Sequence, residues 1–430
     1  MPKIYINPPR QQWLSILQRP APEQTQNQDF IRQLFEEVQR EGDHALKRYA
    51  LALDKFEGDW LVTEQEFEAA EALISVELKS ALELAYQNIY RFHQAELPES
   101  VGVETMQGVW CERRAFPIEK VGLYIPGGSA PLFSTVLMLG IPAQLAGCAE
   151  VVLCSPPQPD GSIHPAILYA AKRCNIQKVL KIGGAQAIAG MALGTASVPK
   201  CSKLFGPGNR WVTAAKQYAS SLGTAIDMPA GPSEVLVLAD QTANPVFVAA
   251  DLLAQAEHGS DSQVLLVSTH KALLQQVEQE LEKLSENLSR RSYIQQTLQH
   301  SCLIYVPNRK EAIDLVNLYA PEHLIIQSQD EQWYTENVRN AGSVFLGDWS
   351  PESVGDYASG TNHTLPTAGF AEAWSGVSVE SFMKFITFQK LSPEGLRGLG
   401  TAVETLAHAE TLEAHALAVS VRLSALKTKT

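Results

Sequence analysis

The sequence lacks the features that would mark a secreted, membrane or nucleic-acid-binding protein. Its six cysteines are scattered without a CxxC pair, which argues against a zinc ribbon or a disulfide framework and favours a reducing cytoplasm. The formal net charge is −13, which argues against nucleic-acid and anionic-membrane partners. No apolar stretch approaches the ~18 residues of a transmembrane helix. The start shows no signal peptide pattern. We therefore expect a cytoplasmic protein.

What the chain does have is a regular alternation of short Val/Ile/Leu-rich runs with segments of helical composition. The runs lie at 121–125, 150–154, 178–182 and 203–205, and again at 235–239, 263–268, 302–306, 323–326 and 343–347. Such alternation is typical of βαβ units. It predicts an α/β fold with two Rossmann-like, doubly wound units and mainly parallel sheets.

Helical segments flank these two series of strands. Residues 23–98 look helical, with a capping-box pattern at Thr63 and Glu66. From about residue 377 the strand pattern stops, and residues 401–424 predict one long helix rich in Ala and Leu. We predict four parts: an N-terminal arm at 1–20, a discontinuous α/β domain at 21–120 and 235–376, a second α/β domain at 121–234, and a helical C-terminal tail at 377–430.

Three strands of the first series run into glycine turns, at 125–131, 182–187 and 205–210. Backbone N–H groups beyond the carboxyl ends of parallel strands suit phosphate or nucleotide binding. The same glycines also serve ordinary tight turns. None of the turns matches G-x-G-x-x-G, because Trp211 occupies the third glycine position. A nucleotide is compatible with these residues, but NAD does not follow from them.

The stretch at 244–263 predicts a buried helix with a polar stripe. Asp251, Gln255 and His258 are spaced i, i+4, i+7 and share one face of a helix that is otherwise apolar almost all round. Buried polar groups need partners, since an unpaired one costs roughly 1–3 kcal/mol. Two interpretations stay open: an internal hydrogen-bond network, or a metal or polar-substrate site built from oxygen and nitrogen donors.

Further candidate donors lie downstream. Residues 347–367 form a Gly/Ser/Asp-rich segment that contains Asp356 and His363, and long structureless segments inside a compact domain are often functional. Glu410 and His415 lie among Ala and Leu in the C-terminal helix. Surface solvation is the alternative for each of these residues taken alone.

Glu322 and His323 stand side by side where a short apolar run begins. Read alone, they form a strand entrance with exposed polar side chains. Neighbouring side chains on a regular strand point to opposite faces. Both can serve one site only if the backbone bends at 321–323, which Pro321 would favour.

Six long motifs are specific enough to be compared, as a set, with known protein families. They are VGLYIPGGSAPLFSTVLML (121–139), FGPGNRWVTAAK (205–216), DMPAGPSEVLVLAD (227–240), QAEHGSDSQ (255–263), YAPEHL (319–324) and GDYASGTNHTLPT (355–367). In this order and spacing they strongly resemble the histidinol dehydrogenase family, from roughly residue 25 to the C-terminus. The resemblance implies oxidation of L-histidinol to L-histidine through L-histidinaldehyde, the last steps of histidine biosynthesis. It also implies two uses of NAD and one bound Zn²⁺ per subunit.

The resemblance carries over to individual residues of this chain. It implies a metal set of Gln255, His258, Asp356 and His415. It implies substrate contacts from Ser233, Gln255, His258, His323, Asp356, His363, Glu410 and His415. It implies NAD contacts from Tyr124, Gln186 and Asn209, which makes 121–234 the NAD-side domain. Finally, it implies a homodimer in which the C-terminal tail completes the site of the partner.

Glu322 and His323 are the general bases in this hypothesis. His323 would take the alcohol proton in the first oxidation, because imidazole titrates near neutrality. Glu322 would activate water for the second. A cysteine route is disfavoured, since all six cysteines lie outside the proposed site motifs. Two rivals remain: a metal-dependent hydrolase with a zinc-bound water, and a non-catalytic binding module.

Overall fold

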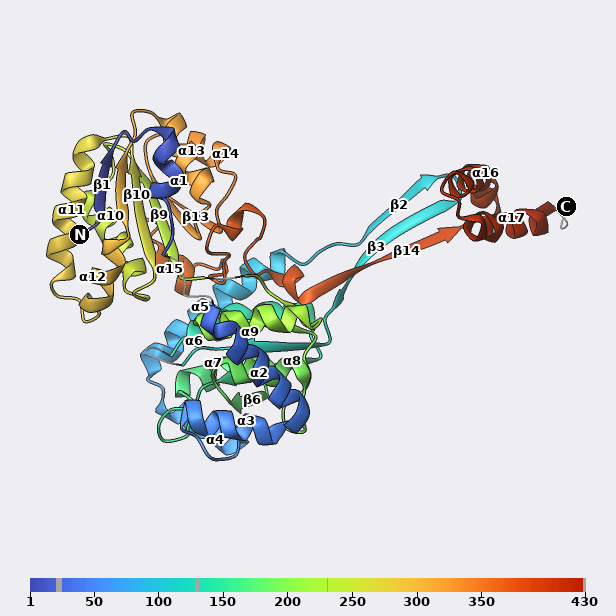
Figure 1. Cartoon of the computed structure of the whole chain (residues 1–430), viewed down its shortest axis with the longest axis horizontal. Helices are drawn as coiled ribbons and strands as arrows, with labels where there is room; N and C mark the ends of the chain where they lie inside the picture. The colour runs from blue at the N-terminus through green and yellow to red at the C-terminus, as the bar shows by residue number, and fades with distance from the viewer. Residues whose placement is uncertain (21–24, 128–130, 230, 428–430) are drawn as a thin grey trace. The chain divides into compact units, whose positions relative to one another are not determined.

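The structure is a computed structural model of the whole chain and describes residues 1–20, 25–127, 131–229 and 231–427. It divides into two compact units (Figure 1). Unit 1 comprises Met1–Glu96 and Ile118–Phe382, and unit 2 comprises Leu97–Pro117 and Met383–Thr430. Among the described residues, none of the helices combines the length and the apolar character that a membrane span requires.

One sheet of unit 1 has six strands, all parallel to their neighbours. In spatial order they are β1 (Lys3–Ile6), β11 (Cys302–Tyr305), β10 (Gln263–Ser268), β9 (Glu234–Ala239), β12 (His323–Gln327) and β13 (Ser343–Leu346). The central strands are buried on both faces, which is why they read as continuous apolar runs.

Helices cover both faces of this sheet. One face packs against α10 (Pro245–Ala256), α11 (Lys271–Ser285) and α12 (Arg291–Gln299). The other packs against α1 (Trp13–Ile16), α13 (Arg309–Tyr319) and α14 (Glu331–Asn337). Helix α10 begins as its sequence predicts, with the Asn244 side chain accepting from the Val246 N–H and Pro245 in the first turn.

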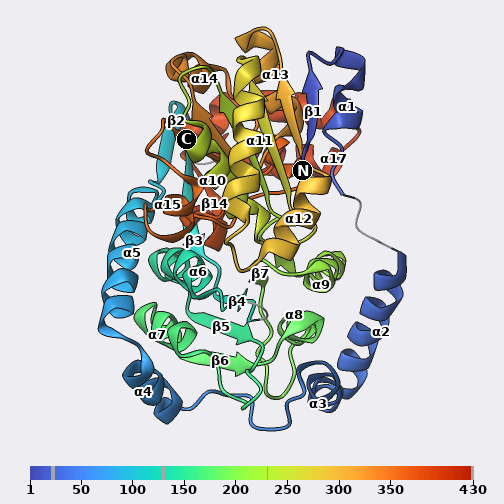
Figure 2. The same cartoon turned by 90° about the vertical axis from the view of Figure 1, so that its left-hand side faces the viewer.

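The second sheet of unit 1 has five strands and is also parallel. Its order is β6 (Lys178–Lys181), β5 (Glu150–Ser155), β4 (Lys120–Tyr124), β7 (Lys203–Phe205) and β8 (Ala225–Ile226). Figure 2 shows α6 (Phe133–Ala146) and α7 (Pro165–Arg173) on one side and α8 (Gly184–Leu193) and α9 (Arg210–Ser221) on the other. The two sheets confirm the predicted α/β fold.

The N-terminal helices pack on the five-stranded sheet, whereas we predicted residues 21–120 in one domain with 235–376. They are α2 (Thr25–Glu41), α3 (Asp43–Tyr49), the π-helical η2 (Ala50–Asp54), α4 (Glu64–Leu73) and α5 (Val76–Ala95). Ile31 and Leu34 share one core with Ile188 of α8 and Ala215 of α9. A helical period shows which face is apolar but not which sheet that face covers. The capping box of Thr63 and Glu66 is present at the start of α4.

The first residues are part of the six-stranded sheet rather than a separate arm. Strand β1 pairs with β11, and the short turn η1 (Arg10–Gln12) leads into α1. Arg19 then donates to both carboxylate oxygens of Glu234, at 2.5 and 2.9 Å, and stacks over the Tyr319 ring. The N-terminal segment is therefore fastened at the point where β9 begins.

Unit 2 contains strands that the sequence pattern did not predict. An antiparallel sheet joins β14 (Met383–Leu391), β3 (Val109–Pro117) and β2 (Val101–Met106), so the expectation that strands stop at about 377 is wrong. Helices α16 (Pro393–Ala409) and α17 (Glu413–Lys427) replace the single helix expected at 401–424. Thr411, with a φ of 60°, and the Leu412 N–H to Ala407 C=O bond separate them. Strands exposed on both faces carry no clear apolar alternation, which explains the miss.

Two short 3₁₀ turns, η3 (Phe370–Glu372) and η4 (Val379–Phe382), complete unit 1.

Candidate active site

The backbone bends where Glu322 and His323 meet, as predicted. Helix α13 ends at Ala320 in the left-handed region (φ 50°), Glu322 lies in a bend, and His323 is the first residue of β12. Both side chains are buried, at 6% and 3% exposure. The bend turns them toward each other, with 3.6 Å between Glu322 Oε2 and His323 Nδ1. A regular strand would have sent them to opposite faces.

The neighbouring strand β9 holds both groups through its backbone. The N–H of Glu234 donates to Glu322 Oε2 at 2.9 Å, and the C=O of Glu234 lies 3.2 Å from His323 Nδ1. A carbonyl oxygen only accepts, so Nδ1 of His323 carries the proton in that bond. Nε2 is then the atom that turns to the site. It is buried and makes no hydrogen bond with the described residues.

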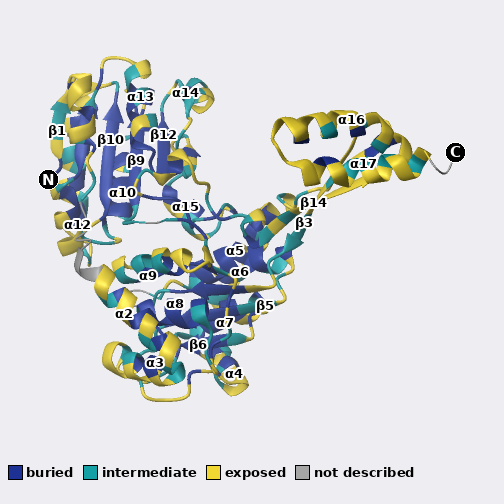
Figure 3. Cartoon of the chain, turned by 45° about the vertical axis from the view of Figure 1, so that its right-hand side comes forward, coloured by how far each residue is buried: buried dark blue, intermediate teal, exposed yellow. Residues whose placement is uncertain are grey.

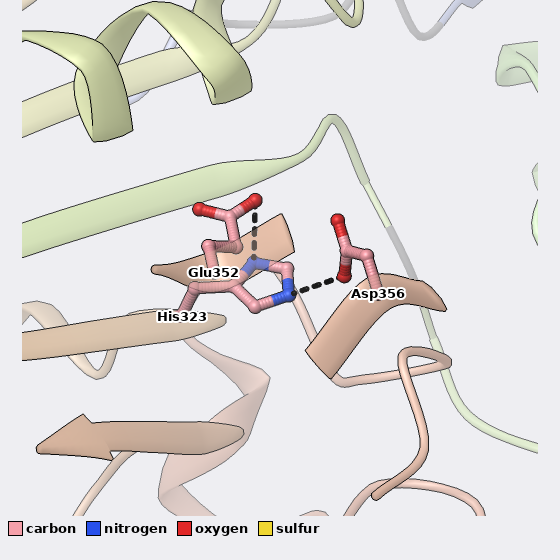
Figure 4. Close-up of side chains that lie close together, drawn as sticks. All are labelled: His323, Glu352 and Asp356. Atoms are coloured by element: carbon pink, nitrogen blue, oxygen red, sulfur yellow. Dashed lines mark ion pairs between the residues drawn. The ribbon is translucent and has the colours of Figure 1, made fainter. Parts of the chain in front are cut away.

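Helix α15 (Glu352–Tyr357) supplies two further carboxylates. Glu352 and Asp356 are four residues apart and share one face of this short helix. Glu352 Oε1 lies 3.7 Å from His323 Nδ1, and Asp356 Oδ1 lies 3.5 Å from His323 Nε2 (Figure 4). The donor atoms of these three residues all lie within 4.8 Å of one another, which is a separation that a metal ion could bridge.

The polar stripe of α10 borders this cluster. Gln255 is fully buried, and its amide group lies against the carboxyl group of Glu352. His258 follows the end of the helix, remains exposed, and interacts electrostatically with Asp356 and His323. Asp251 accepts a hydrogen bond from Gln327 at 3.1 Å instead of facing the cluster. The stripe thus divides between an internal network and the site.

His363 joins the site through the backbone of Asp356. Its Nδ1 lies 2.8 Å from the Asp356 C=O, and its Nε2 lies 3.1 Å from Thr135 Oγ1 on α6. Because the carbonyl can only accept, Nδ1 is the donor, and Nε2 of the neutral ring accepts from the Thr135 hydroxyl. Burial favours that neutral form by lowering the pKa of His363.

The charges of the cluster shift one another's pKa values. Burial raises the pKa of Glu322 to about 8. Burial opposes the charged form of His323, but the carboxylates of Glu352, Glu322 and Asp356 outweigh it and raise its pKa well above the usual range. Asp356 experiences the same desolvation, yet its contact with His323 keeps its pKa below the ordinary value. The pKa of Glu322 therefore lies near neutral pH, and the neighbouring Asp356 is ionised.

The predicted cofactor residues lie at the carboxyl ends of the five-stranded sheet. Tyr124 ends β4, and its hydroxyl accepts from the Gly184 N–H at 3.0 Å. Gln186, two residues on, donates to Asp54 Oδ2 at 2.9 Å, while its buried Oε1 has no hydrogen-bond partner among the described residues. Asn209 caps α9 by accepting from two backbone N–H groups. Residues 128–130 of the first glycine turn lie outside the described residues.

The remaining predicted residues divide between the two units. Ser233 directly precedes Glu234 in unit 1, and its C=O accepts from the Gln263 N–H at 3.2 Å. Glu410 and His415 belong to unit 2, where both side chains are exposed.

Sequence reasoning missed three residues of this region: Asp54, Glu234 and Glu352. Glu234 lies in a motif that we quoted, but only its backbone reaches the bases. Asp54 comes from η2 and accepts from the Gly183 N–H at 3.1 Å, although the two residues are 129 positions apart. The four-residue spacing of Glu352 and Asp356 was the one signal that could have been found.

The donor set fits a divalent cation of the zinc type. Gln255 offers an amide oxygen, Asp356 offers a carboxylate, and His258 offers an imidazole nitrogen. Mixed oxygen and nitrogen donors without thiolates suit zinc in sites that stay open to further ligands.

Comparison with known proteins agrees with these features. The family profile described as histidinol dehydrogenase matches residues 17–423. A histidinol dehydrogenase from Bacteroides thetaiotaomicron is 54% identical over 428 residues, which cover 99% of this chain and 100% of the relative. One from Vibrio vulnificus is 51% identical over 416 residues, which cover 96% of each chain. The crystal structure of histidinol dehydrogenase from Elizabethkingia anophelis matches with a TM-score of 0.97 at 52% identity, over 99% of this chain and 98% of that one. The chain belongs to the histidinol dehydrogenase family of oxidoreductases.

Proposed function

We propose that this protein oxidises L-histidinol to L-histidine through L-histidinaldehyde, with two molecules of NAD as hydride acceptors. The observation that carries the proposal is the buried pair Glu322 and His323, whose side chains meet at one point despite being adjacent in sequence. Two oxidations at one centre need two proton-transfer groups with different tasks. The names of the relatives supply the substrate.

His323 is the base for the alcohol. The carbonyl of Glu234 engages Nδ1, which leaves Nε2 of the neutral ring as the atom that takes the hydroxyl proton while hydride leaves the same carbon for NAD. Because the surrounding carboxylates raise the pKa of His323, the rate of this step should increase with pH. This step converts alcohol and NAD⁺ to aldehyde, NADH and one proton. Asp356 lies 3.5 Å from Nε2, so its negative charge stabilises the imidazolium that forms.

Glu322 is the base for the second step, in which water adds to the aldehyde. As a carboxylate it accepts a proton from the attacking water, and the hydrate then loses hydride to a second NAD⁺. With a pKa of about 8 set by burial, Glu322 is a stronger base than an exposed glutamate would be. The balance of this step is aldehyde, water and NAD⁺ giving carboxylate, NADH and two protons.

A zinc ion would be held by Gln255, His258 and Asp356, with His415 supplied by a second copy of the chain. When bound, the ion would orient the imidazole and amine of the substrate as a Lewis acid without redox chemistry of its own. Ser233, His363 and Glu410 would provide the remaining substrate contacts. Their roles follow from the family resemblance.

A homodimer is supported by the composition of unit 2. Its helices and strands expose many large apolar side chains. Figure 3 shows α16 and α17 mainly in yellow, the colour of exposed residues. Examples are Trp110, Leu406, Leu417 and Val421. Its buried apolar residues among those described are few: Val109, Ala407 and Ala416. A unit that buries so little of its own apolar surface is best stabilised by a second protein surface.

NAD would bind at the glycine turns of the five-stranded sheet, with contacts from Tyr124, Gln186 and Asn209. Their positions at the carboxyl ends of β4, β6 and β7 match the general rule for ligands of parallel sheets. The unpartnered buried Oε1 of Gln186 is an acceptor available to a ligand.

A cysteine-linked intermediate finds no support. All six cysteines are unpaired, and Cys154, Cys174, Cys201 and Cys302 are buried. Burial raises the pKa of the Cys302 thiol to about 12, far from the thiolate that nucleophilic catalysis needs. Unpaired cysteines also suit a reducing compartment, so we place the protein in the cytoplasm.

The deciding experiment counts NADH formed per molecule of histidinol, before and after removal of metal with a chelator. We expect two NADH per substrate, loss of turnover without metal and its return with zinc. One NADH per substrate would limit the enzyme to the alcohol step. No NADH would favour the metal-dependent hydrolase, which uses the same donors but leaves the glycine turns without a task.

A further inference from the structure

Arg19 belongs to the segment that we predicted as a separate arm, yet its side chain lies mostly buried at the start of β9. Its Nε and Nη2 donate to the two carboxylate oxygens of Glu234, at 2.5 and 2.9 Å. Two parallel hydrogen bonds of this kind fix the orientation of the guanidinium as well as its distance. The Glu234 side chain is 3% exposed, and a carboxylate so far removed from water needs a partner of opposite charge. Arg19 supplies that charge.

The same guanidinium also holds the end of α13. Its Nη2 donates to the Tyr319 C=O at 2.7 Å, and the planar group stacks over the Tyr319 ring, 3.9 Å from the centroid. The last carbonyl groups of a helix have no partner within the helix, and here the chain turns away at Ala320, with a φ of 50°. Arg19 satisfies the Tyr319 carbonyl, which lies just before the bend that leads to Glu322.

Glu234 connects this ion pair to the bases. Its N–H donates to Glu322 Oε2, and its C=O accepts from His323 Nδ1. Its side chain accepts from Arg19 and from the Ala368 N–H, the latter at 2.9 Å. Glu234 is the first residue of β9, and the ends of an element open more easily than its middle. The anchoring of the Glu234 side chain therefore helps to fix the two peptide groups that hold the bases.

We propose that Arg19 is a positioning residue for the proton-transfer pair Glu322 and His323. It fixes the two backbone segments that place these bases, one through Glu234 and the other through Tyr319. The inference rests on the proposed function, in which the pair serves two successive oxidations. It gives the N-terminal segment a task in the reaction, although that segment precedes all six motifs that carry the family resemblance.

The alternative is a tether that only stabilises the fold, and Arg10 provides the comparison. Arg10 lies in the same segment, pairs with Asp314 of α13 at 2.6 Å and stacks over the Trp13 ring. It thus makes the same kinds of contact as Arg19, with one carboxylate and one aromatic ring. Loss of the Arg10 contacts should weaken the attachment of the segment without changing the geometry of the bases.

The experiment compares Arg19→Lys with the zinc-loaded parent enzyme in NAD-linked turnover of histidinol. Lysine keeps the charge, but its donors sit on one atom and cannot make the paired bonds of a guanidinium. We expect kcat to fall about 10- to 100-fold, the effect of displacing reacting groups by about 1 Å. The proposed NAD contacts lie on the five-stranded sheet, so KM for NAD should stay within about 2-fold. In the matched control Arg10→Lys, both constants should stay within about 2-fold of the parent values.

A double variant removes the ion pair without leaving a buried charge unpaired. In Arg19→Met combined with Glu234→Gln, the introduced amide can still accept from the Ala368 N–H, so the variant should fold. We expect its kcat to fall about 100-fold, with circular dichroism unchanged.

Hydrogen exchange measures the positioning without turnover. The Glu234 N–H should exchange about 10-fold faster in Arg19→Lys than in the parent protein, because its acceptor Glu322 is held less firmly. The same N–H should exchange at the parent rate in Arg10→Lys.

Four results would overturn the inference. They are a parent-like kcat in Arg19→Lys, an equal fall of kcat in Arg10→Lys, a parent-like kcat in the folded double variant, and an unchanged exchange rate of the Glu234 N–H. Failure of the proposed function looks different, since the parent enzyme itself would then form no NADH from histidinol.

Discussion

The two parallel sheets of unit 1 place different kinds of groups at the ends of their strands. The six-stranded sheet gathers ionisable side chains at the amino ends of its strands, where the carboxylates of Glu322 and Asp356 lie 3.6 and 3.5 Å from the His323 ring. The five-stranded sheet presents mainly backbone N–H groups and neutral side chains, such as the Gly184 N–H that meets the hydroxyl of Tyr124, together with the Asp54 carboxylate beside Gly183. The same topology thus supports either proton transfer or the cradling of a neutral or anionic ligand. The residues beside the strand ends decide which.

The largest effect is expected from a substitution of His323, at the amino end of β12 in the six-stranded sheet. His323→Asn removes the base atom Nε2 and should lower both oxidations about 10³-fold, since a positioned base contributes 10²–10⁴-fold. The measurement is NADH formation from histidinol and, separately, from histidinaldehyde. His323 takes a hydroxyl proton as hydride leaves in each oxidation, first from the alcohol and then from the aldehyde hydrate, so loss of only one of the two oxidations would contradict this role.

The second test separates the two bases. Glu322→Gln should slow aldehyde oxidation about 10²-fold and leave alcohol oxidation much less affected, because only the second step activates water. Single-turnover kinetics with each substrate would resolve the steps. Equal, small losses for both substrates would refute this division of labour.

A pH series sharpens the same point through stability. Burial raises the pKa of Glu322 to about 8 in the folded state, so the folded protein holds this proton more tightly than the unfolded chain does. The resulting stabilisation is complete below the unfolded pKa near 4.5 and is lost as pH rises through about 8. The free energy of unfolding of Glu322→Gln relative to the parent protein should therefore increase by about 4 kcal/mol between pH 5 and pH 9. Urea unfolding at both pH values measures this difference, and a constant difference would mean that Glu322 is not held neutral.

The smallest effect is expected at the carboxyl end of the five-stranded sheet. Tyr124→Phe removes the acceptor of the Gly184 N–H and should raise the KM for NAD about 5-fold, the value of one hydrogen bond near 1 kcal/mol. Burial raises the pKa of the Tyr124 hydroxyl to about 12, so the effect should be constant between pH 6 and pH 9. A pH-dependent effect would show that this end of the molecule also depends on charge.

The sequence predicted features that are written in local spacing. Period and turn chemistry act over a few residues. They made accessible the stripe of Asp251 and Gln255, the bend before His323 and the strands of both parallel sheets except β1 and β8. The long motifs then identified the family, and the family resemblance implied the site residues. Those roles remain predictions for all of the site residues, Ser233, Glu410 and His415 included.

Other features depend on contacts between distant segments and had little local signal, which for Glu352 was only its four-residue spacing from Asp356. Asp54 reaches Gly183 only through the packing of the N-terminal helices on the five-stranded sheet. Glu352 lies on a six-residue helix, too short to show an apolar period within a segment rich in Gly, Ser and Asp. The strands of unit 2 escaped because neither face is regularly buried.

The hydrogen bond between Glu234 and Glu322 has a consequence for the order of folding. It joins residues 88 positions apart, at the start of the neighbouring parallel strands β9 and β12. Contacts of such long sequence separation form late, because closing a long loop costs entropy before the contact repays it. Glu322 and His323 are therefore held against Glu234 only after β9 and β12 have paired. During refolding, helical content should return first and catalytic turnover afterwards.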